Sequence, residues 1–373
     1  MIRLKFHPLS SASWTIFWRK YFKHRPFHHE SRGQRVLAII VLLLRSPFYL
    51  AERLIYDRRI SLQAIDQGPI FVIGHWRSGT THLHNILSQD DQFSYLSFSN
   101  MIMPHDLLLG RLLPVIPWIM KRALPKTRGI DRLPLSPSLP QEEELTLGML
   151  SGESYYNCYF HPGSWDEYFS EAIPDASRSH GSPGMRESYL KLLRKLSYLN
   201  HGKRLIFKNP ASTSRITMLK ELFPNAKFIH IRRNPYAVYA SSRARLPRMV
   251  SAFSLNDAPE LDYDAITLRS YRELMTSYFD QRKGIPEADL LETSYEELIS
   301  DPEKVIRQIY SKFGLERSAT TIENHSRYLE AQTSYQKNTH LLTHSQIQEI
   351  ESQWGFALKE WDYGYPEGLE IVD

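Results

Sequence analysis

The apolar positions of the chain alternate between two patterns, one typical of buried strands and one typical of helices. Short runs rich in β-branched and aromatic residues predict strands buried on both faces at 70–73, 204–208 and 226–231. Helical periodicity follows these runs, at 83–87, 216–223 and from Tyr236 onward, and also fills 185–200. Strands and helices that alternate with short links imply parallel strands. The pattern therefore predicts an α/β fold with a P-loop-like parallel sheet flanked by helices.

Residues 1–66 form a basic and apolar N-terminal segment that we expect to be helical. Its longest apolar run, Val36–Leu44, ends at Arg45 and is far shorter than the roughly 20 residues that span a bilayer. The segment also lacks the pattern of a signal peptide. Helices in a membrane interface and helices packed on the core explain this composition equally well. Because no run is long enough to span a bilayer, we expect a cytoplasmic protein, with peripheral contact at the inner face of the membrane and a Golgi lumen as open alternatives.

Residues 67–373 are expected to form the α/β domain, interrupted by a long, mostly helical insertion at 90–200. Within the insertion, 107–124 is apolar but contains Pro114 and Pro117, which exclude a long regular helix. A long insertion of this kind is usually functional when it is ordered. It can serve as a lid over an apolar acceptor, as a membrane-dipping element or as a buried loop.

Composition and charge narrow the classes of partner. The net charge of the 373 residues is +5, which suits a polyanionic cosubstrate or an anionic membrane surface. No arginine-rich tract or base-stacking motif accompanies it, so we expect no nucleic-acid partner. The single cysteine, Cys158, excludes an internal disulfide and is expected to be a small packing residue.

The loop after the first strand carries the strongest chemical signal. Gly74 and Gly79 have the spacing of the nucleotide-triphosphate motif G-x-x-x-x-G-K-[ST], but Thr80 replaces its lysine and a cation stands earlier, at Arg77. Strand, glycine loop and helix together direct backbone N–H groups at an anion. The loop therefore predicts a site for a phosphate-like group without the magnesium-bound triphosphate.

Two further cations follow strand ends. Lys208 ends the run 204–208, and Arg233 follows the run 226–231. Functional groups in parallel sheets lie at the carboxyl ends of the strands. We therefore expect Arg77, Lys208 and Arg233 to face one crevice.

With these residues in place, the chain resembles the sulfotransferases that use 3′-phosphoadenosine 5′-phosphosulfate (PAPS). The sequence Arg77-Ser78-Gly79-Thr80-Thr81 is similar to their 5′-phosphosulfate loop. The resemblance implies that Lys208 contacts the transferring sulfuryl group and that Arg233 and Ser241 share the 3′-phosphate. It also implies a late phosphate contact at Lys337 and an adenine contact at His82, where relatives carry tryptophan. The stretch 290–302 is similar to the family's downstream strand and turn, which implies a further strand there.

The general base is less clear, because the position of the family's histidine is Pro210 here and Ser212 is a poor base. The acidic stretch 142–144 opens a predicted helix, and some bacterial members resemble it there. One interpretation is that these acids lie in the first turn of the helix, where the helix dipole stabilises negative charge. The other is that Glu142 or Glu144 acts as the general base and accepts a proton from the acceptor hydroxyl. His105 and Asp106 are the next candidates.

These features lead to the hypothesis of sulfuryl transfer from PAPS to the hydroxyl of a hydrophobic alcohol such as a lipid or sterol, with no metal required. A carbohydrate or peptide tyrosine acceptor stays open. The rival functions are an NTP-dependent kinase and a non-catalytic, membrane-associated nucleotide-binding protein. The sequence also leaves open a homo-oligomer.

Overall fold

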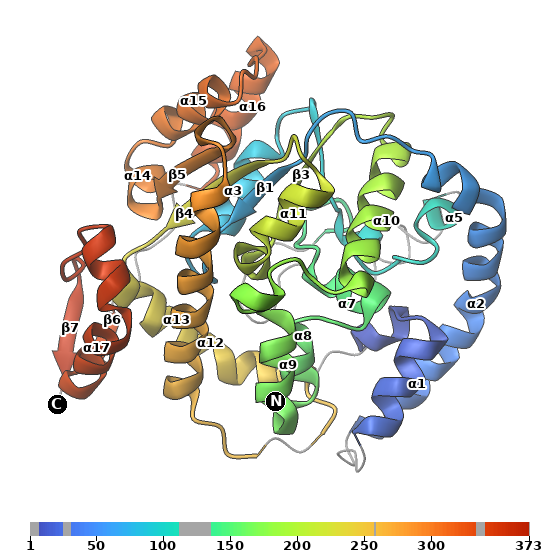
Figure 1. Cartoon of the computed structure of the whole chain (residues 1–373), viewed down its shortest axis with the longest axis horizontal. Helices are drawn as coiled ribbons and strands as arrows, with labels where there is room; N and C mark the ends of the chain where they lie inside the picture. The colour runs from blue at the N-terminus through green and yellow to red at the C-terminus, as the bar shows by residue number, and fades with distance from the viewer. Residues whose placement is uncertain (1–6, 25–30, 112–135, 257–258, 333–339, 373) are drawn as a thin grey trace.

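The computed structural model describes residues 7–24, 31–111, 136–256, 259–332 and 340–372. At its centre is a five-stranded sheet in the order β2-β3-β1-β4-β5, in which all neighbouring strands are parallel (Figure 1). The predicted α/β fold is confirmed. The strands of this sheet are β1 (Ile70–Ile73), β2 (Phe93–Ser94), β3 (Arg204–Lys208), β4 (Lys227–Arg232) and β5 (Leu290–Ser294).

Helices cover both faces of the sheet because alternate strand residues point to opposite sides. Phe71, Phe207 and Phe228 join the core that includes residues of α10, α11, α12 and α13. On the other face, Ile70 and Ile229 pack with residues of α3, α14 and α15. The helices from α3 onward are α3 (Thr80–Leu87), α4 (Phe98–Met101), α5 (Leu107–Arg111), α7 (Glu144–Ser151), α8 (Tyr156–Phe160), α9 (Trp165–Ala172), α10 (Pro183–Leu199), α11 (Ile216–Leu222), α12 (Pro235–Phe253), α13 (Tyr263–Gln281), α14 (Tyr295–Ser300), α15 (Pro302–Lys312), α16 (Ala319–Glu330) and α17 (His344–Glu360).

The N-terminal segment contains two helices, α1 (Trp14–Lys23) and α2 (Arg32–Ser61), and α2 runs along one edge of the molecule (Figure 1). The inner side of α2 contributes Ala38, Leu42 and Ile60 to the same core as the sheet. Within the described residues, no helix combines the length and apolar character needed to cross a bilayer.

Two strand features were missed by the sequence analysis. The edge strand β2 lies inside the insertion and has only two residues. A separate parallel pair, β6 (His340–Thr343) and β7 (Leu369–Val372), lies near the C-terminus. Of the apolar stretch 107–124, α5 is described and the rest lies outside the described residues.

Candidate active site

The loop between β1 and α3 is held in a conformation that few residues tolerate. Gly74, Arg77 and Gly79 all have positive φ, at 138°, 72° and 92°. A Cβ added to Gly79 would lie 2.5 Å from the ring of Tyr295, so the close approach requires glycine. The backbone N–H of Gly74 donates to Thr213 Oγ1 over 2.8 Å, which ties the loop to the segment after β3. Arg77 adopts left-handed backbone without being glycine, a strain found most often at functional sites.

Arg77, Arg233 and Ser241 form one connected group at the carboxyl edge of β1 and β4. The Arg77 Nε donates to Ser241 Oγ over 2.8 Å, and Arg233 Nη1 donates to the backbone carbonyl of Arg77 over 3.0 Å. The Arg233 guanidinium also lies 4.2 Å from the centre of the Tyr295 ring. Two guanidinium groups and a hydroxyl thus meet beside the glycine loop, an arrangement suited to a phosphate.

Lys208 meets an acid from the insertion at the end of β3. Its ammonium donates to Glu142 Oε2 over 2.8 Å, and the Tyr156 hydroxyl donates to Glu142 Oε1 over 2.9 Å. Burial raises the pKa of Glu142, but the charges of Lys208 and Arg245 and the two hydrogen bonds outweigh it and hold that pKa below its usual value. Glu142 is therefore an ionised carboxylate paired with the strand-end lysine.

Glu144 is two residues away but has different surroundings. Its carboxylate accepts from Arg215 Nη1 over 2.7 Å, from Asn209 Nδ2 over 2.8 Å and from the backbone N–H of Tyr155 over 2.7 Å. Glu144 and Arg215 are both almost completely buried. This carboxylate connects α7 to the segment after β3 and has its acceptor capacity largely used.

Glu143 is fully buried and differs from both neighbours. Within the described part of the chain, neither of its carboxyl oxygens contacts a hydrogen-bond partner. Burial raises the pKa of Glu143 to about 8, against smaller lowerings by its own backbone N–H and by the charge of Lys208. Glu143 is thus an uncharged carboxylic acid at neutral pH.

The other predicted site residues divide by position. Ser78 and Thr80 are buried at the start of α3, while Thr81 and His82 are partly exposed. Burial lowers the pKa of His82, whose ring centre is 6.1 Å from that of Tyr328. Lys337 lies outside the described residues.

Asp106 and His105, the other candidates for the general base, make contacts away from Lys208 and the glycine loop. The Asp106 carboxylate accepts from Arg45 Nε over 3.0 Å, which links α5 to α2. The His105 Nε2 lies 3.1 Å from the carbonyl of Met149, and burial lowers the pKa of His105 to about 4. Neither contact includes Lys208 or the glycine loop.

The sequence analysis missed Tyr156, Arg215 and Arg245. Arg245 follows Ser241 by one turn of α12, so the two share a helix face, and its side chain reaches the Tyr159 hydroxyl at 3.4 Å. This spacing of four residues from a predicted phosphate ligand is the signal that could have identified Arg245. Tyr156 and Arg215 carry no comparable signal.

The fold places Arg77, Lys208 and Arg233 at the carboxyl ends of three adjacent parallel strands, β1, β3 and β4. A model of the sulfotransferase family matches residues 69–319. The chain belongs to the sulfotransferase family, and the predicted class of enzyme is confirmed.

Relatives span nearly the whole chain. The omega-hydroxy-beta-dihydromenaquinone-9 sulfotransferase Stf3 of Mycobacterium tuberculosis is 28% identical over 354 residues, which cover 94% of this chain and 90% of that protein. The crystal structure of sulfotransferase STF9 from Mycobacterium avium has a TM-score of 0.72 at 19% identity and covers 95% of this chain and 91% of its own. Sulfotransferase STF1 from Mycobacterium tuberculosis follows, with a TM-score of 0.55 at 18% identity and 80% coverage of each chain. These structures share the fold.

Proposed function

We propose that this enzyme transfers the sulfuryl group of PAPS to the hydroxyl of a hydrophobic alcohol, a lipid or sterol. The observation that carries the proposal is the connection of Arg77, Ser241 and Arg233 at one edge of the sheet, with Lys208 at the end of the adjacent strand β3. PAPS has anionic groups at two separated points, the 3′-phosphate and the 5′-phosphosulfate, and the cations at this edge support a site for both.

The glycine loop and its arginine are assigned to the 5′-phosphosulfate. Backbone N–H groups at the start of α3 and the hydroxyls of Thr80 and Thr81 would donate to it together with Arg77. Ser78 and Gly79 shape the loop. This assignment uses the electrostatics of a helix N-terminus, which favours an anion.

The 3′-phosphate is assigned to Arg233 and Ser241, with Lys337 as a further contact from outside the described residues. Arg77 donates to the hydroxyl of Ser241, so the two phosphate subsites are linked directly. His82 is assigned to the adenine. Burial lowers the pKa of His82, so the imidazole is neutral at pH 7 and can stack on the adenine as an uncharged ring.

The chemical step is assigned to Glu142 and Lys208. The acceptor oxygen bonds to sulfur as the bond from sulfur to the bridging phosphate oxygen breaks, and adenosine 3′,5′-bisphosphate leaves with the electron pair. Lys208 stabilises the charge that grows on the bridging oxygen, and Glu142 accepts the acceptor's proton. Cations of the chain supply this stabilisation, so we expect transfer in the presence of EDTA.

The ion pair itself explains how the base becomes active. While Lys208 contacts Glu142, the lowered pKa makes Glu142 a weak base. A cosubstrate that draws Lys208 away removes the largest stabilisation of the carboxylate, and the pKa of Glu142 rises. Glu144 is a weaker candidate for the base because Arg215, Asn209 and Tyr155 already occupy its oxygens.

The hydrophobic acceptor is supported by the mycobacterial relative, whose name gives omega-hydroxy-beta-dihydromenaquinone-9, a lipid alcohol, as its substrate. A carbohydrate is the alternative acceptor. Peripheral membrane contact belongs to the same proposal, because a lipid alcohol resides in a bilayer.

The test is calorimetric titration of adenosine 3′,5′-bisphosphate with EDTA present, beside ATP with magnesium. We expect binding of the bisphosphate without metal, followed by transfer of labelled sulfate to long-chain alcohols or sterols in preference to sugars. Binding of magnesium-ATP alone would support the kinase instead. Binding of the bisphosphate with no transfer to any alcohol, sugar or tyrosine peptide would support a non-catalytic protein.

A further inference from the structure

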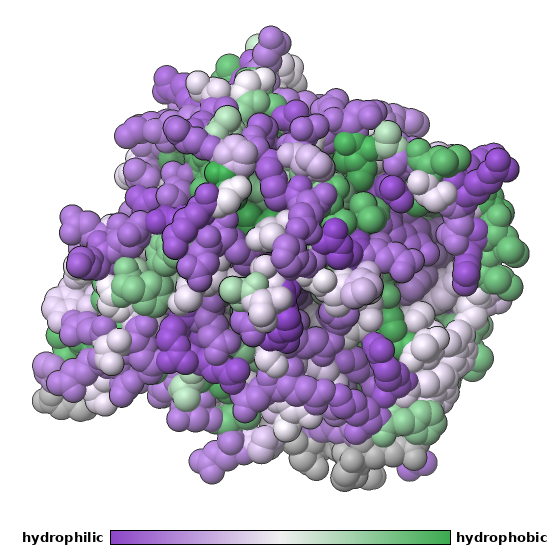
Figure 2. Space-filling view, in the orientation of Figure 1, coloured by the Kyte–Doolittle hydropathy of each residue, from purple (hydrophilic) through white to green (hydrophobic). Residues whose placement is uncertain are grey.

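The outer face of α2 is an exposed apolar stripe. Ile40, Leu43, Leu44, Leu50, Leu54 and Ile55 are all largely exposed, with Leu44 at 67% and Leu54 at 77%. Figure 2 shows apolar atoms along the edge of the molecule where α2 runs in Figure 1. Most large apolar side chains that are exposed on a soluble protein occur singly, so a stripe of this length requires an explanation.

The stripe follows the geometry of one helix face. A helix turns 100° per residue, so Val36 and Leu54 have the same direction and lie about 27 Å apart along the axis. The opposite side of α2 is fixed to the protein by Leu42 and by the buried pair of Glu52 with Lys195. The helix therefore cannot rotate to bury its outer leucines.

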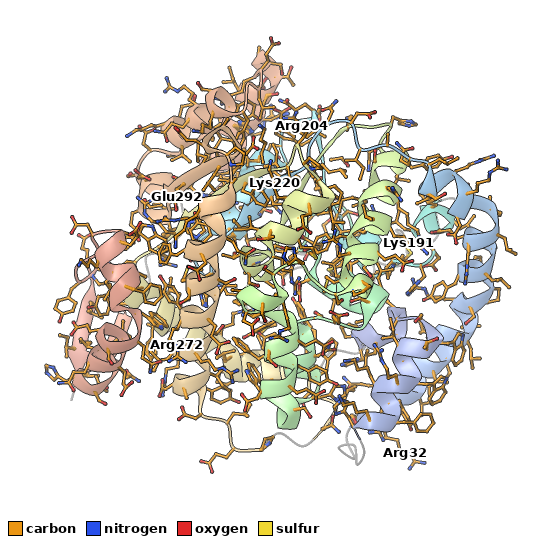
Figure 3. All side chains as sticks on the ribbon, in the orientation of Figure 1. Arg32, Lys191, Arg204, Lys220, Arg272 and Glu292 are labelled. Atoms are coloured by element: carbon orange, nitrogen blue, oxygen red, sulfur yellow. The ribbon has the colours of Figure 1, made fainter. Side chains whose placement is uncertain are left out.

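Positive charge accompanies the stripe. Residues 32–62 contain six arginines and two acids. Of the acids, Glu52 is buried, and Asp57 lies 3.4 Å from Arg53 and 3.8 Å from Lys191 of α10. Figure 3 places Arg32 near the start of α2 and Lys191 on the helix beside it. The exposed arginines beside the leucines therefore outnumber the acids of α2, and the helix carries a net positive charge.

We propose that the outer face of α2 docks in the interface of a membrane that contains anionic lipids. Leucines that enter the acyl boundary with arginines at the headgroups are the composition of an interfacial helix. The surface potential of anionic lipids adds to this attraction through Arg53, Arg58 and Arg59. A second copy of the chain is disfavoured as the occupant, because pairing two such stripes would bring like-charged arginines together.

Docking would bring the acceptor side of the enzyme to the bilayer, and this consequence rests on the proposed function. On its inner side, α2 holds the start of the insertion, since Glu52 accepts from the backbone N–H groups of Leu108 and Leu109. Glu52 also accepts from Lys195 of α10, and α10 packs against α7, which begins two residues after Glu142, the proposed base. Described residues therefore connect the docking helix to the acceptor end of the proposed active site.

The test is co-sedimentation of the full chain with phosphatidylcholine vesicles, with and without phosphatidylglycerol. We expect tighter binding to the anionic vesicles and a loss of that preference at high salt. The double variant Leu43→Ser with Leu54→Ser should bind anionic vesicles less tightly by roughly tenfold or more for each leucine. The double variant Arg58→Ser with Arg59→Ser should lose roughly fivefold for each arginine.

Matched controls separate docking from loss of fold and from catalysis. Ile299 and Ile322 are exposed isoleucines on α14 and α16, and their double serine variant should bind vesicles like the wild type. Lys208→Ala should also bind vesicles normally while it loses transfer, so failure of the proposed function leaves this result intact. The leucine variant should keep wild-type transfer to a short-chain, water-soluble alcohol.

Two results would overturn the proposal. One is equal vesicle binding by the wild type and the leucine variant. The other is a wild-type dimer in sedimentation velocity that the leucine variant converts to a monomer, with no vesicle binding by either protein. The second result would identify a copy of the chain as the occupant of the stripe.

Discussion

Lys208 donates to Glu142 over 2.8 Å, so the cation at the end of β3 and the acid of the insertion form one ion pair. The proposed function gives these groups opposite tasks, one at the leaving oxygen and one at the acceptor hydroxyl. Under that proposal, the pairing restrains the base until Lys208 turns to the cosubstrate, so proton transfer is coupled to cosubstrate binding.

The first prediction concerns the lysine. Lys208→Ala should lower kcat by roughly 10²–10³, because it removes one electrostatic contact to the developing negative charge. Lys203 is exposed five residues earlier, and Lys203→Ala serves as a control that should leave the rate unchanged. A Lys208→Ala variant with nearly wild-type kcat would contradict the role of Lys208.

The second prediction concerns the pH dependence of kcat/KM, which reports ionisations of the free enzyme. The pKa of Glu142 lies below its usual value in the Lys208 pair, so the base stays ionised as pH falls through the ordinary glutamate range. The fall of kcat/KM at acidic pH, the acidic limb of the profile, should therefore begin only below the usual glutamate range. In Lys208→Met the carboxylate loses its partner, and the limb should move to higher pH. An unchanged limb in both Lys208→Met and Glu142→Gln would exclude Glu142 as the base.

The third prediction concerns the link between the phosphate subsites. Ser241→Ala removes a hydroxyl that accepts from Arg77 and is proposed to donate to the 3′-phosphate. Hydrogen bonds to charged groups contribute about 1.5–3 kcal/mol, so affinity for adenosine 3′,5′-bisphosphate should fall roughly tenfold to a hundredfold. Arg243→Ala, on the exposed side of the same helix, should keep wild-type affinity in the same calorimetric titration.

Much of the fold could be read from the sequence because buried parallel strands carry continuous apolar runs. The runs at β1, β3 and β4 are of this type, and each is ended or closely followed by a cation in the sequence. The strand β2 could not be found in this way, since two residues give no periodicity. The pair of β6 and β7 joins segments far apart in sequence, and their contact has no local signal.

The acidic stretch shows where sequence reasoning ends. Glu142, Glu143 and Glu144 are chemically identical, and each successive residue near a helix start points in a different direction. One carboxyl meets Lys208, one meets Arg215 and one meets no partner among the described residues. The partners come from distant segments, so only the folded chain separates the three roles.

The fourth prediction concerns Glu144. Glu144→Gln leaves Arg215 buried without its counter-charge, which should lower the free energy of unfolding by about 3–5 kcal/mol. Glu323→Gln breaks the exposed pair with Arg327 and should have little effect in the same urea titration. At low temperature, the folded fraction of Glu144→Gln should keep most of its transfer activity. A large loss of kcat without a loss of stability would instead make Glu144 the base.

The last prediction concerns Glu143. Its pKa is raised to about 8 in the folded chain from a usual value of 4.5, because burial disfavours the charged form. Between these pH values the unfolded chain releases the proton and the folded chain retains it, so the unfolding free energy falls as pH rises.

Glu143→Gln removes this loss, since the amide cannot ionise. The variant should be more stable than the wild type by a margin that grows by about 1.4 kcal/mol per pH unit across the window and then levels off above the folded pKa. Urea titrations at several pH values measure the margin. The control is Asp289→Asn, because burial raises the pKa of Asp289 but hydrogen bonds from Lys220 and Lys227 outweigh it and lower that pKa, so its margin should stay flat above the usual aspartate range. A flat margin for Glu143→Gln as well would mean that Glu143 is charged in the folded chain and has a partner that stabilises it.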